Sequence, residues 1–264
     1  MRKADGKNLC GNRENAGDGK ADRASAEYRI PEQVSSGQRL PERNVQKRGD
    51  GRHLFCKGAC AQKESGAYLG GVFLNEEEQG GGPLIDIGTH ALDLTLWMMD
   101  NYEVASVTGA VFHKLSQQTD QGNAFGNWDP EQFKVEDSAF GFIRMKNGAL
   151  IELESAWALN TLDVDEAKTS ICGTKAGADM KDGLHINRIH HNTQTVEIPD
   201  LSGGGVAFFA GEEKSAADVE QELFYHIVVE GQEQIVKPEQ AAVVTRVLEA
   251  IYRSAESGET IYFD

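Results

Sequence analysis

Two acidic residues and one histidine stand close together in the apolar stretch Gly80–Met99. Asp86 lies four residues before His90, and Asp93 lies three residues after it. In a helix, residues three and four apart share one face, so this spacing places the three side chains side by side. A histidine held by a carboxylate can exchange a proton near neutral pH. We therefore take Asp86 and His90 as candidate catalytic residues.

The same spacing admits two other interpretations. Asp93 can cap or pair within the helix while His90 is a satisfied core residue, because perturbed polar groups also occur in purely structural networks. The three side chains also have a spacing that permits metal binding, but no further ligand is evident, so no metal is predicted. His190 and His191, at the end of a predicted hairpin, are interpreted as exposed turn residues.

Charge is distributed unevenly along the 264 residues, whose net charge is -16. Residues 1–70 carry 14 Lys and Arg against 9 Asp and Glu, whereas the remainder carries 12 against 33. An acidic body argues against nucleic-acid binding, which needs a cationic surface. Nothing approaches the ~20 apolar residues of a membrane span, and the start of the chain lacks the apolar core of a signal peptide. The sequence predicts a cytoplasmic protein with neither a nucleic-acid nor a membrane partner.

The four cysteines are Cys10, Cys56, Cys60 and Cys172. Four are few for a disulfide scaffold, and the lack of an export signal indicates a reducing compartment. Cys56 and Cys60 have no second cysteine pair or ordered histidines nearby to complete a zinc site. Free thiols are predicted.

The pattern of residues changes along the chain. Residues 1–65 are polar and show no periodicity, which is typical of a disordered arm. After residue 71 the sequence predicts a helix over 84–99, a strand over 104–115, a long loop over 116–134, strands over 135–145 and 149–158 around an Asn-Gly turn, a strand over 166–174 ended by turns at Gly173 and Gly177, a hairpin over 185–198, helices over 216–230 and 238–257, and a strand over 260–263. Tyr225 and His226 are interpreted as core packing. The sum predicts an α+β domain: a predominantly antiparallel open sheet with helices packed on one face.

Two further stretches bear on function. Long loops in compact domains are often functional, so Trp128 in the loop 116–134 is predicted to border a ligand and contribute to substrate binding. The glycine runs do not match a dinucleotide-binding fingerprint, which needs a preceding strand and fixed glycine spacing. The sequence therefore offers no cofactor-binding residues.

Residues 81–93 follow the pattern G-G-x-L-x-D-x-G-x-H-x-x-D. This run closely resembles the opening of the second domain of the Gfo/Idh/MocA oxidoreductases, the relatives of glucose–fructose oxidoreductase and inositol dehydrogenase. The similarity continues less strictly through Ile171–Ala178 and Ala242–Ala255. It implies a substrate-binding and oligomerisation domain over residues 71–264, preceded by an unstructured head over residues 1–70.

The resemblance implies the substrate domain of an NAD(P)-dependent oxidoreductase that acts on a sugar, polyol or related alcohol. Members of the family carry a Rossmann domain and an E-K-P motif ahead of this domain, and neither is visible here. The resemblance implies that His90 exchanges the proton of the substrate hydroxyl and that Asp86 orients the substrate. It also implies that the intact family uses NAD or NADP, that this chain binds neither stably, and that two copies pair through the open sheet face. The alternative is a non-catalytic sheet module for self-association or ligand binding.

The head resembles family sequence in a shifted reading frame. Read one nucleotide later, Met1–Asn8 can become C-E-K-P-M-A-K-T, and Arg29–Val34 can become G-F-Q-N-R-F. In the same frame His53–Ala61 can become I-Y-F-A-K-A-R-A-L, and Ala67–Leu69 can become P-T-W just before Gly71. We therefore expect the head to be translated out of frame and the chain to be a truncated member. The nucleotide sequence tests this, because the shifted frame upstream should encode E-K-P and a Rossmann domain.

Overall fold

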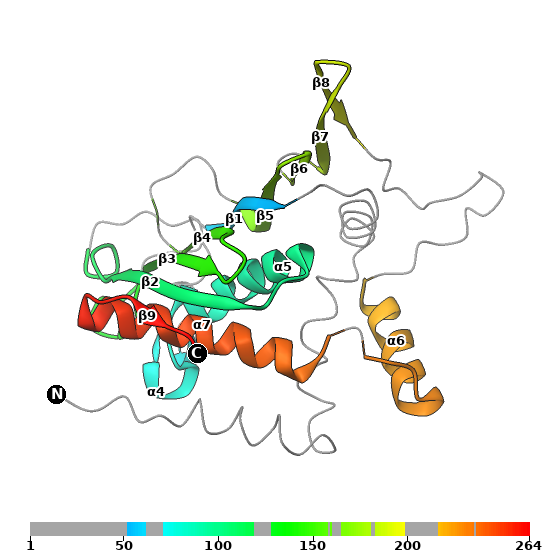
Figure 1. Ribbon diagram of the computed structural model, residues 1–264. Coiled ribbons are helices and arrows are strands. Elements are labelled where there is room, and N and C mark those ends of the chain that lie inside the picture. Colours follow the sequence, from blue (N-terminus) through cyan, green and yellow to red (C-terminus); the bar gives the residue numbers. More distant parts are fainter. Residues whose placement is uncertain are drawn as a thin grey trace.

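A mixed sheet organises the part of the chain that the computed structural model describes, namely residues 52–61, 71–118, 128–157, 159, 165–180, 183–198, 216–234 and 236–264. Within these residues nine strands lie in the order β8-β7-β6-β5-β1-β4-β3-β2-β9 (Figure 1). The strands are β1 His53–Ala61, β2 Val104–Phe112, β3 Ser138–Met145, β4 Leu150–Ala156, β5 Asp165–Gly173, β6 Ala176–Asp179, β7 His185–His190, β8 Thr193–Glu197 and β9 Ile261–Tyr262. β1 and β4 run parallel, and the other described pairs are antiparallel. The predicted α+β class is confirmed.

Two long helices cover one face of the sheet. α5 (Thr89–Met99) packs against β1 and β5, and α7 (Pro238–Ser257) packs against β2 and beside α5 (Figure 1). The shorter helical segments are η2 Gly71–Leu74, α4 Glu76–Gln79 and η3 Leu84–Gly88, and α6 spans Ala216–Glu230. Along β4 the buried Ile151 and Leu153 alternate with the exposed Glu152, as a sheet with one solvated face requires. The long helices α5 and α7 therefore lie on one face of the sheet, as predicted.

Strand β1 corrects the expectation of an unstructured head over residues 1–70. His53–Ala61 lies inside the sheet, parallel to β4 and antiparallel to β5. Gly58 is buried, and a Cβ there would lie 2.6 Å from Thr95 Oγ1 of α5. A strand that lies this close to a helix needs small residues where the two meet. The strand was missed in the sequence because β1 lacks the β-branched residues that are typical of strands. Within the described residues the first strand of the sheet begins at residue 53, and residues 1–51 and 62–70 lie outside the described residues.

Both predicted hairpins are present. β3 and β4 are joined at Asn147-Gly148, where Gly148 has φ +88° and the Asn147 side chain accepts a hydrogen bond from the N–H of Ala149 (3.0 Å). β7 and β8 are joined at His191 and Asn192, with φ of +49° and +59°. Two-residue hairpin turns of this kind require positive φ at both positions. His191 is therefore an exposed turn residue, as interpreted from the sequence, whereas His190 is exposed but is the last residue of β7.

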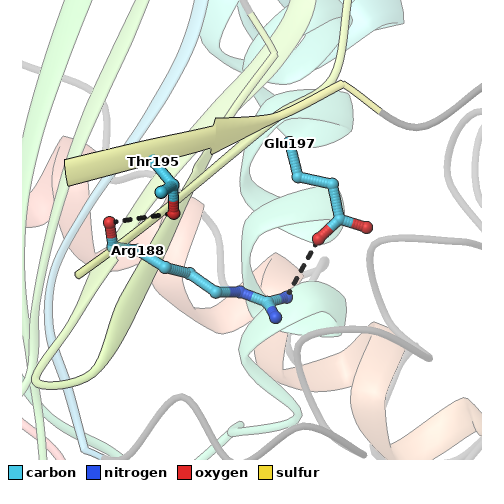
Figure 2. A network of polar contacts seen from close by, with 3 residues as sticks. All are labelled: Arg188, Thr195 and Glu197. Carbon is cyan, nitrogen blue, oxygen red and sulfur yellow. Dashed lines mark hydrogen bonds and ion pairs between the residues drawn. The ribbon is translucent and has the colours of Figure 1, made fainter. Parts of the chain in front are cut away.

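Polar contacts join the two strands of the second hairpin. Figure 2 shows the Thr195 hydroxyl donating to the carbonyl oxygen of Arg188 (3.4 Å), while Arg188 Nη2 lies 3.8 Å from Glu197 Oε2. Pairs of this kind at a protein surface contribute on the order of 0–1 kcal/mol. The hairpin therefore depends mainly on its turn and backbone ladder.

Further expectations differ from the structure. The strand predicted over 104–115 ends at Phe112, and the strand predicted over 135–145 begins at Ser138. Gly177 lies within β6 rather than in a turn. A Cβ at Gly177 would lie 2.9 Å from the carbonyl oxygen of Ile171, so the close strand pairing explains the glycine. Tyr225 of α6 is 55% exposed, and the Nδ1 atom of His226 lies 2.8 Å from Glu230 Oε2. Tyr225 is therefore not a core residue and His226 is only half-buried, because α6 does not pack extensively against any other described element.

The thiols that the structure describes are free. Cys56 is buried and Cys172 is exposed, and neither forms a disulfide. Burial raises the pKa of Cys56 to about 12, so this thiol stays protonated at neutral pH. None of the helices in the described residues has the length and apolar composition to cross a bilayer.

Candidate functional site

Asp86 and His90 lie on a helix that begins with a wide turn. η3 is a π-helical turn that carries Asp86, and it continues directly into α5, whose second residue is His90. Both side chains are half-buried. π turns are rare and are frequently found at functional sites. The helix predicted over 84–99 is confirmed in extent, and its first turn is wider than an α-helix.

A tryptophan from the adjacent strand holds the carboxylate of Asp86. Trp157 follows β4 directly, and its indole Nε1–H donates to Asp86 Oδ2 at 3.1 Å. Burial raises the pKa of the Asp86 carboxyl above its ordinary value, while the Trp157 hydrogen bond and the nearby His90 act in the opposite direction. The net upward direction shows that loss of hydration outweighs both favourable contacts. A carboxyl with a raised pKa beside a histidine suits proton exchange with a hydroxyl group.

A second buried carboxylate fixes the start of the site helix. Glu136 is 3% exposed, and its two oxygens accept the backbone N–H groups of Gly82 (2.8 Å) and Leu84 (3.1 Å). The Tyr252 hydroxyl of α7 donates to the same carboxylate at 2.8 Å. The first N–H groups of a helix have no partner within it, and Glu136 supplies that partner from a distant segment. Burial raises the pKa of Glu136, and the three hydrogen bonds oppose that rise.

The glycines before the helix make this contact possible. A Cβ at Gly82 would overlap the backbone carbonyl oxygen of Glu136, and a Cβ at Gly81 would overlap the hydroxyl of Tyr252. Gly80 ends α4 with φ +87°. The glycine run therefore lets the chain approach a carboxylate closely, which is a different role from cradling a phosphate.

Trp128 is joined to Asp86 through aromatic side chains. Its ring meets Phe133 edge to face, with centroids 6.0 Å apart, and Phe133 meets Trp157 in the same way at 6.2 Å. The indole N–H of Trp128 donates to the carbonyl oxygen of Ser116 at 2.9 Å. The series Trp128–Phe133–Trp157 therefore leads from the predicted ligand loop to the candidate carboxylate. Residues 119–127 of that loop lie outside the described residues.

Asp137 anchors the segment on which Trp128 rests. Its Oδ2 accepts the N–H groups of Leu115 (2.8 Å) and Ser116 (2.9 Å), and its Oδ1 accepts the hydroxyl of Ser138 (2.9 Å). The carboxylate is fully buried. Consecutive acids at the entrance to β3 thus hold two different parts of the site: Glu136 holds the helix and Asp137 holds the loop.

The structure brings the predicted site residues together and adds two that sequence reasoning missed. Trp157 and Glu136 were not singled out, because neither has an informative spacing to Asp86. A signal was nevertheless present, since a tryptophan directly after a buried strand needs an acceptor for its N–H. Asp93 is buried within α5. Among the described residues no group of three or more His, Cys, Asp or Glu side chains is arranged to hold a metal ion.

Comparison with known proteins identifies the family of this domain. Residues 74–263 match the model of the Gfo/Idh/MocA oxidoreductase family, C-terminal alpha/beta domain. The chain belongs to this family. The Gfo/Idh/MocA match begins within η2 and ends after β9, so it contains Asp86, His90, Glu136 and Trp157.

Relatives within the Gfo/Idh/MocA family include enzymes named for sugars. The chain is 35% identical over 208 residues to D-glucoside 3-dehydrogenase of Escherichia coli (strain K12), a match that covers 79% of this chain and 56% of the relative. The chain thus spans little more than half of that relative's length.

Solved structures show the same fold. Levoglucosan dehydrogenase in complex with NADH and L-sorbose has a TM-score of 0.72 at 16% identity, covering 89% of this chain and 65% of that protein. Aldose-aldose oxidoreductase from Caulobacter crescentus, complexed with glycerol, has a TM-score of 0.65 at 19% identity, covering 88% of this chain and 62% of that protein.

Proposed function

We propose that this chain is the substrate-binding part of an NAD(P)-dependent oxidoreductase that acts on a sugar, polyol or related alcohol. The observation that carries the proposal is the placement of Asp86 on a π turn one helical turn before His90, with Asp86 held by Trp157. Membership of the Gfo/Idh/MocA family and the sugar-named relatives support it.

The side chains have distinct roles in this proposal. Asp86 accepts a hydrogen bond from a substrate hydroxyl and orients the carbon that bears it. His90 takes the hydroxyl proton as the alcohol is oxidised and returns it in the reverse direction. Trp128, which is half-buried at the end of the aromatic series, packs against the apolar face of the sugar or polyol.

In the proposed oxidation the hydride leaves the carbon that bears the hydroxyl for NAD or NADP in its oxidised form. A levoglucosan dehydrogenase with the same fold is solved with NADH and L-sorbose. Within the described residues β1 and β4 run parallel, but β2 and β3 lie between them in the chain, so this pair is not the strand–helix–strand unit of dinucleotide-binding folds.

A non-catalytic role is the second candidate, and the open face of the sheet favours it. Phe112 and Phe142 are 42% and 47% exposed there, and Lys57 pairs with Glu154 at 3.2 Å on the same face. We propose that two copies of the chain pair through this face. Such pairing is compatible with both candidate functions, so oligomeric state alone does not separate them.

Ligand titration of the purified chain separates the two candidates. A panel of a D-glucoside, levoglucosan, L-sorbose and glycerol is titrated by NMR with and without NADH. Replacing a charged hydrogen-bonding group costs roughly 1.5–3 kcal/mol, so Asp86→Asn should weaken binding of the preferred ligand by roughly 10- to 100-fold. Glu131→Gln, at an exposed loop position, is the matched control and should leave binding unchanged.

The same titration can also refute the oxidoreductase proposal. When no member of the panel binds in either condition, or when Asp86→Asn binds as well as the parent chain, the oxidoreductase role is excluded. The sheet module for self-association then remains. Oxidation of a panel member with reduction of NAD or NADP would instead establish turnover by this chain.

A further inference from the structure

Trp157 is the best-anchored side chain at the candidate site. It is 1% exposed, its backbone N–H donates to the carbonyl oxygen of Asp137 at 3.1 Å, and its ring packs edge to face on Phe133. A tryptophan whose backbone N–H is bonded and whose buried ring packs against a second aromatic ring has little freedom to turn. The direction in which its Nε1–H points is therefore set by the fold.

The Nε1–H group of Trp157 points at the carboxylate of Asp86. The distance of 3.1 Å from Nε1 to Oδ2 is a hydrogen bond between a neutral donor and a group that can carry charge. The two residues are 71 positions apart, on a strand end and on a π turn that packs against that strand. An indole has one donor and no acceptor, so it can hold the carboxylate but cannot exchange a proton with it.

We propose that Trp157 is a positioning residue, whose indole holds Asp86 Oδ2 so that Oδ1 faces the substrate hydroxyl. This inference rests on the proposed function of Asp86 as the group that orients the substrate. It extends that function by naming what fixes the carboxylate before substrate arrives. The aromatic series then gives Trp128 a second role, which is to transmit ligand binding to the site. A ligand that displaces the Trp128 ring also displaces Phe133, which packs on the Trp157 ring that holds Asp86.

The three tryptophans of the chain allow a direct test, since each gives one indole N–H signal in a 15N spectrum of the whole protein. Assignment uses Trp→Phe variants. The Trp157 signal should move as Asp86 titrates, and Asp86→Asn should remove that movement while leaving Trp157 in place. Trp157→Phe removes a donor to the charged form, so the pKa of Asp86 should rise further. Trp97→Phe, a buried tryptophan of α5, is the matched control and should leave the Asp86 titration unchanged.

Substrate affinity provides the second readout. Trp157→Phe should weaken binding of the preferred panel ligand about tenfold, because a carboxylate that is free to rotate must lose that rotational freedom when the ligand binds. The proposal is overturned if the Trp157 signal is independent of Asp86, or if Trp157→Phe leaves the Asp86 titration unchanged. If the Trp157 signal follows the Asp86 titration but no ligand binds, the proposed function fails and with it the substrate-facing role of Oδ1, whereas the hold of Trp157 on Asp86 stands.

Discussion

The half-buried environment of Asp86 lowers the stability of the folded chain when the carboxyl is ionised. Its carboxyl is half-buried, and burial raises its pKa despite the hydrogen bond from Trp157 and the charge of His90. A raised pKa means that the folded state holds the proton more tightly than the unfolded chain does. The protonated carboxyl thus stabilises the fold at low pH, and that contribution is lost as pH rises through the folded-state pKa. Residues kept for function commonly have this signature.

Asp86→Asn should therefore gain stability relative to the parent chain as pH rises. The two proteins should have similar stability below the unfolded pKa of aspartate, about 3.9, and the difference should favour the variant once pH passes the higher folded-state value. Urea unfolding at several pH values measures it. Glu131→Gln, at an exposed carboxyl, should show no such divergence. A parent chain that gains stability over Asp86→Asn towards neutral pH would contradict the inferred direction.

Gly81 and Gly82, which approach Tyr252 and Glu136 closely, should differ in their tolerance of a methyl group. A Cβ at Gly82 meets backbone, which cannot move aside, whereas a Cβ at Gly81 meets the end of the Tyr252 side chain. Overpacking of this kind costs about 1–3 kcal/mol, and Gly82→Ala should lie at or above the top of that range. Gly81→Ala should cost less, and less again in a Tyr252→Phe background. Thermal or urea unfolding gives the comparison for five proteins: the parent chain, Gly82→Ala, Gly81→Ala, Tyr252→Phe and the Gly81→Ala/Tyr252→Phe double variant. Equal losses at both glycines would count against the prediction.

At the scale of elements, the site depends on contacts between segments far apart in the chain. The π turn and α5 carry Asp86 and His90, the end of β4 carries Trp157, and the approach to β3 carries Glu136. Glu136 joins three elements, because it accepts from the start of the helix and from Tyr252 of α7. A single carboxylate therefore fixes the helix that positions both candidate catalytic residues.

Glu136→Ala should destabilise the chain strongly. It leaves the N–H groups of Gly82 and Leu84 and the Tyr252 hydroxyl without their acceptor, and each such loss in a buried place costs roughly 1–3 kcal/mol. We expect a total loss of about 3 kcal/mol or more by urea unfolding. Glu131→Ala should change stability by no more than about 0.5 kcal/mol. If Glu136→Ala lowered the free energy of unfolding no more than this control, Glu136 would not be needed to hold the start of the helix.

Strand β1 makes a separate prediction. Gly58→Ala places a methyl group against Thr95 and the Ala91 carbonyl of α5, so it should cost about 1–3 kcal/mol. Lys57→Ala changes the neighbouring residue, which pairs with Glu154 on the open face, and should cost no more than about 1 kcal/mol. If Gly58→Ala were as mild as Lys57→Ala, β1 would not lie under α5.

At the scale of the whole molecule, α5 and α7 cover one face of the sheet, and no described helix covers the other face (Figure 1). The open face carries Phe142 and, at its side, Phe112 packed edge to face on Phe140, with centroids 5.9 Å apart. Exposed aromatic residues on a broad sheet are typical of an interaction surface. This surface is the one through which we propose that two copies pair.

Phe142→Glu should convert the proposed dimer into a monomer, because it places a charge where two apolar faces meet. Light scattering after size exclusion measures the mass of both proteins. Ile189→Glu changes an exposed apolar residue of the β7–β8 hairpin and should leave the dimer intact. A parent chain that is monomeric at high concentration, or a dimer that Phe142→Glu leaves unchanged, would refute pairing through the open face.

The sequence by itself determined the features that depend on neighbouring residues. The spacing of Asp86 and His90, the helix from residue 84 to 99, the Asn147-Gly148 turn and the α+β class all follow from local periodicity and turn chemistry. The family pattern around Asp86 then indicated a substrate domain, and the family match agrees with that assignment.

Only the tertiary structure decided which distant groups complete the site. Trp157 reaches Asp86 across 71 positions, and Glu136 reaches Gly82 across 54. The inclusion of β1 in the sheet, next to β4, likewise required the structure, because its small residues match the surface of α5 and not a strand pattern. Strand register and helix packing set these contacts, and neither is encoded in the periodicity of any one segment. The chemical groups of the candidate site were therefore visible in the sequence, whereas their fixed orientation was a property of the fold.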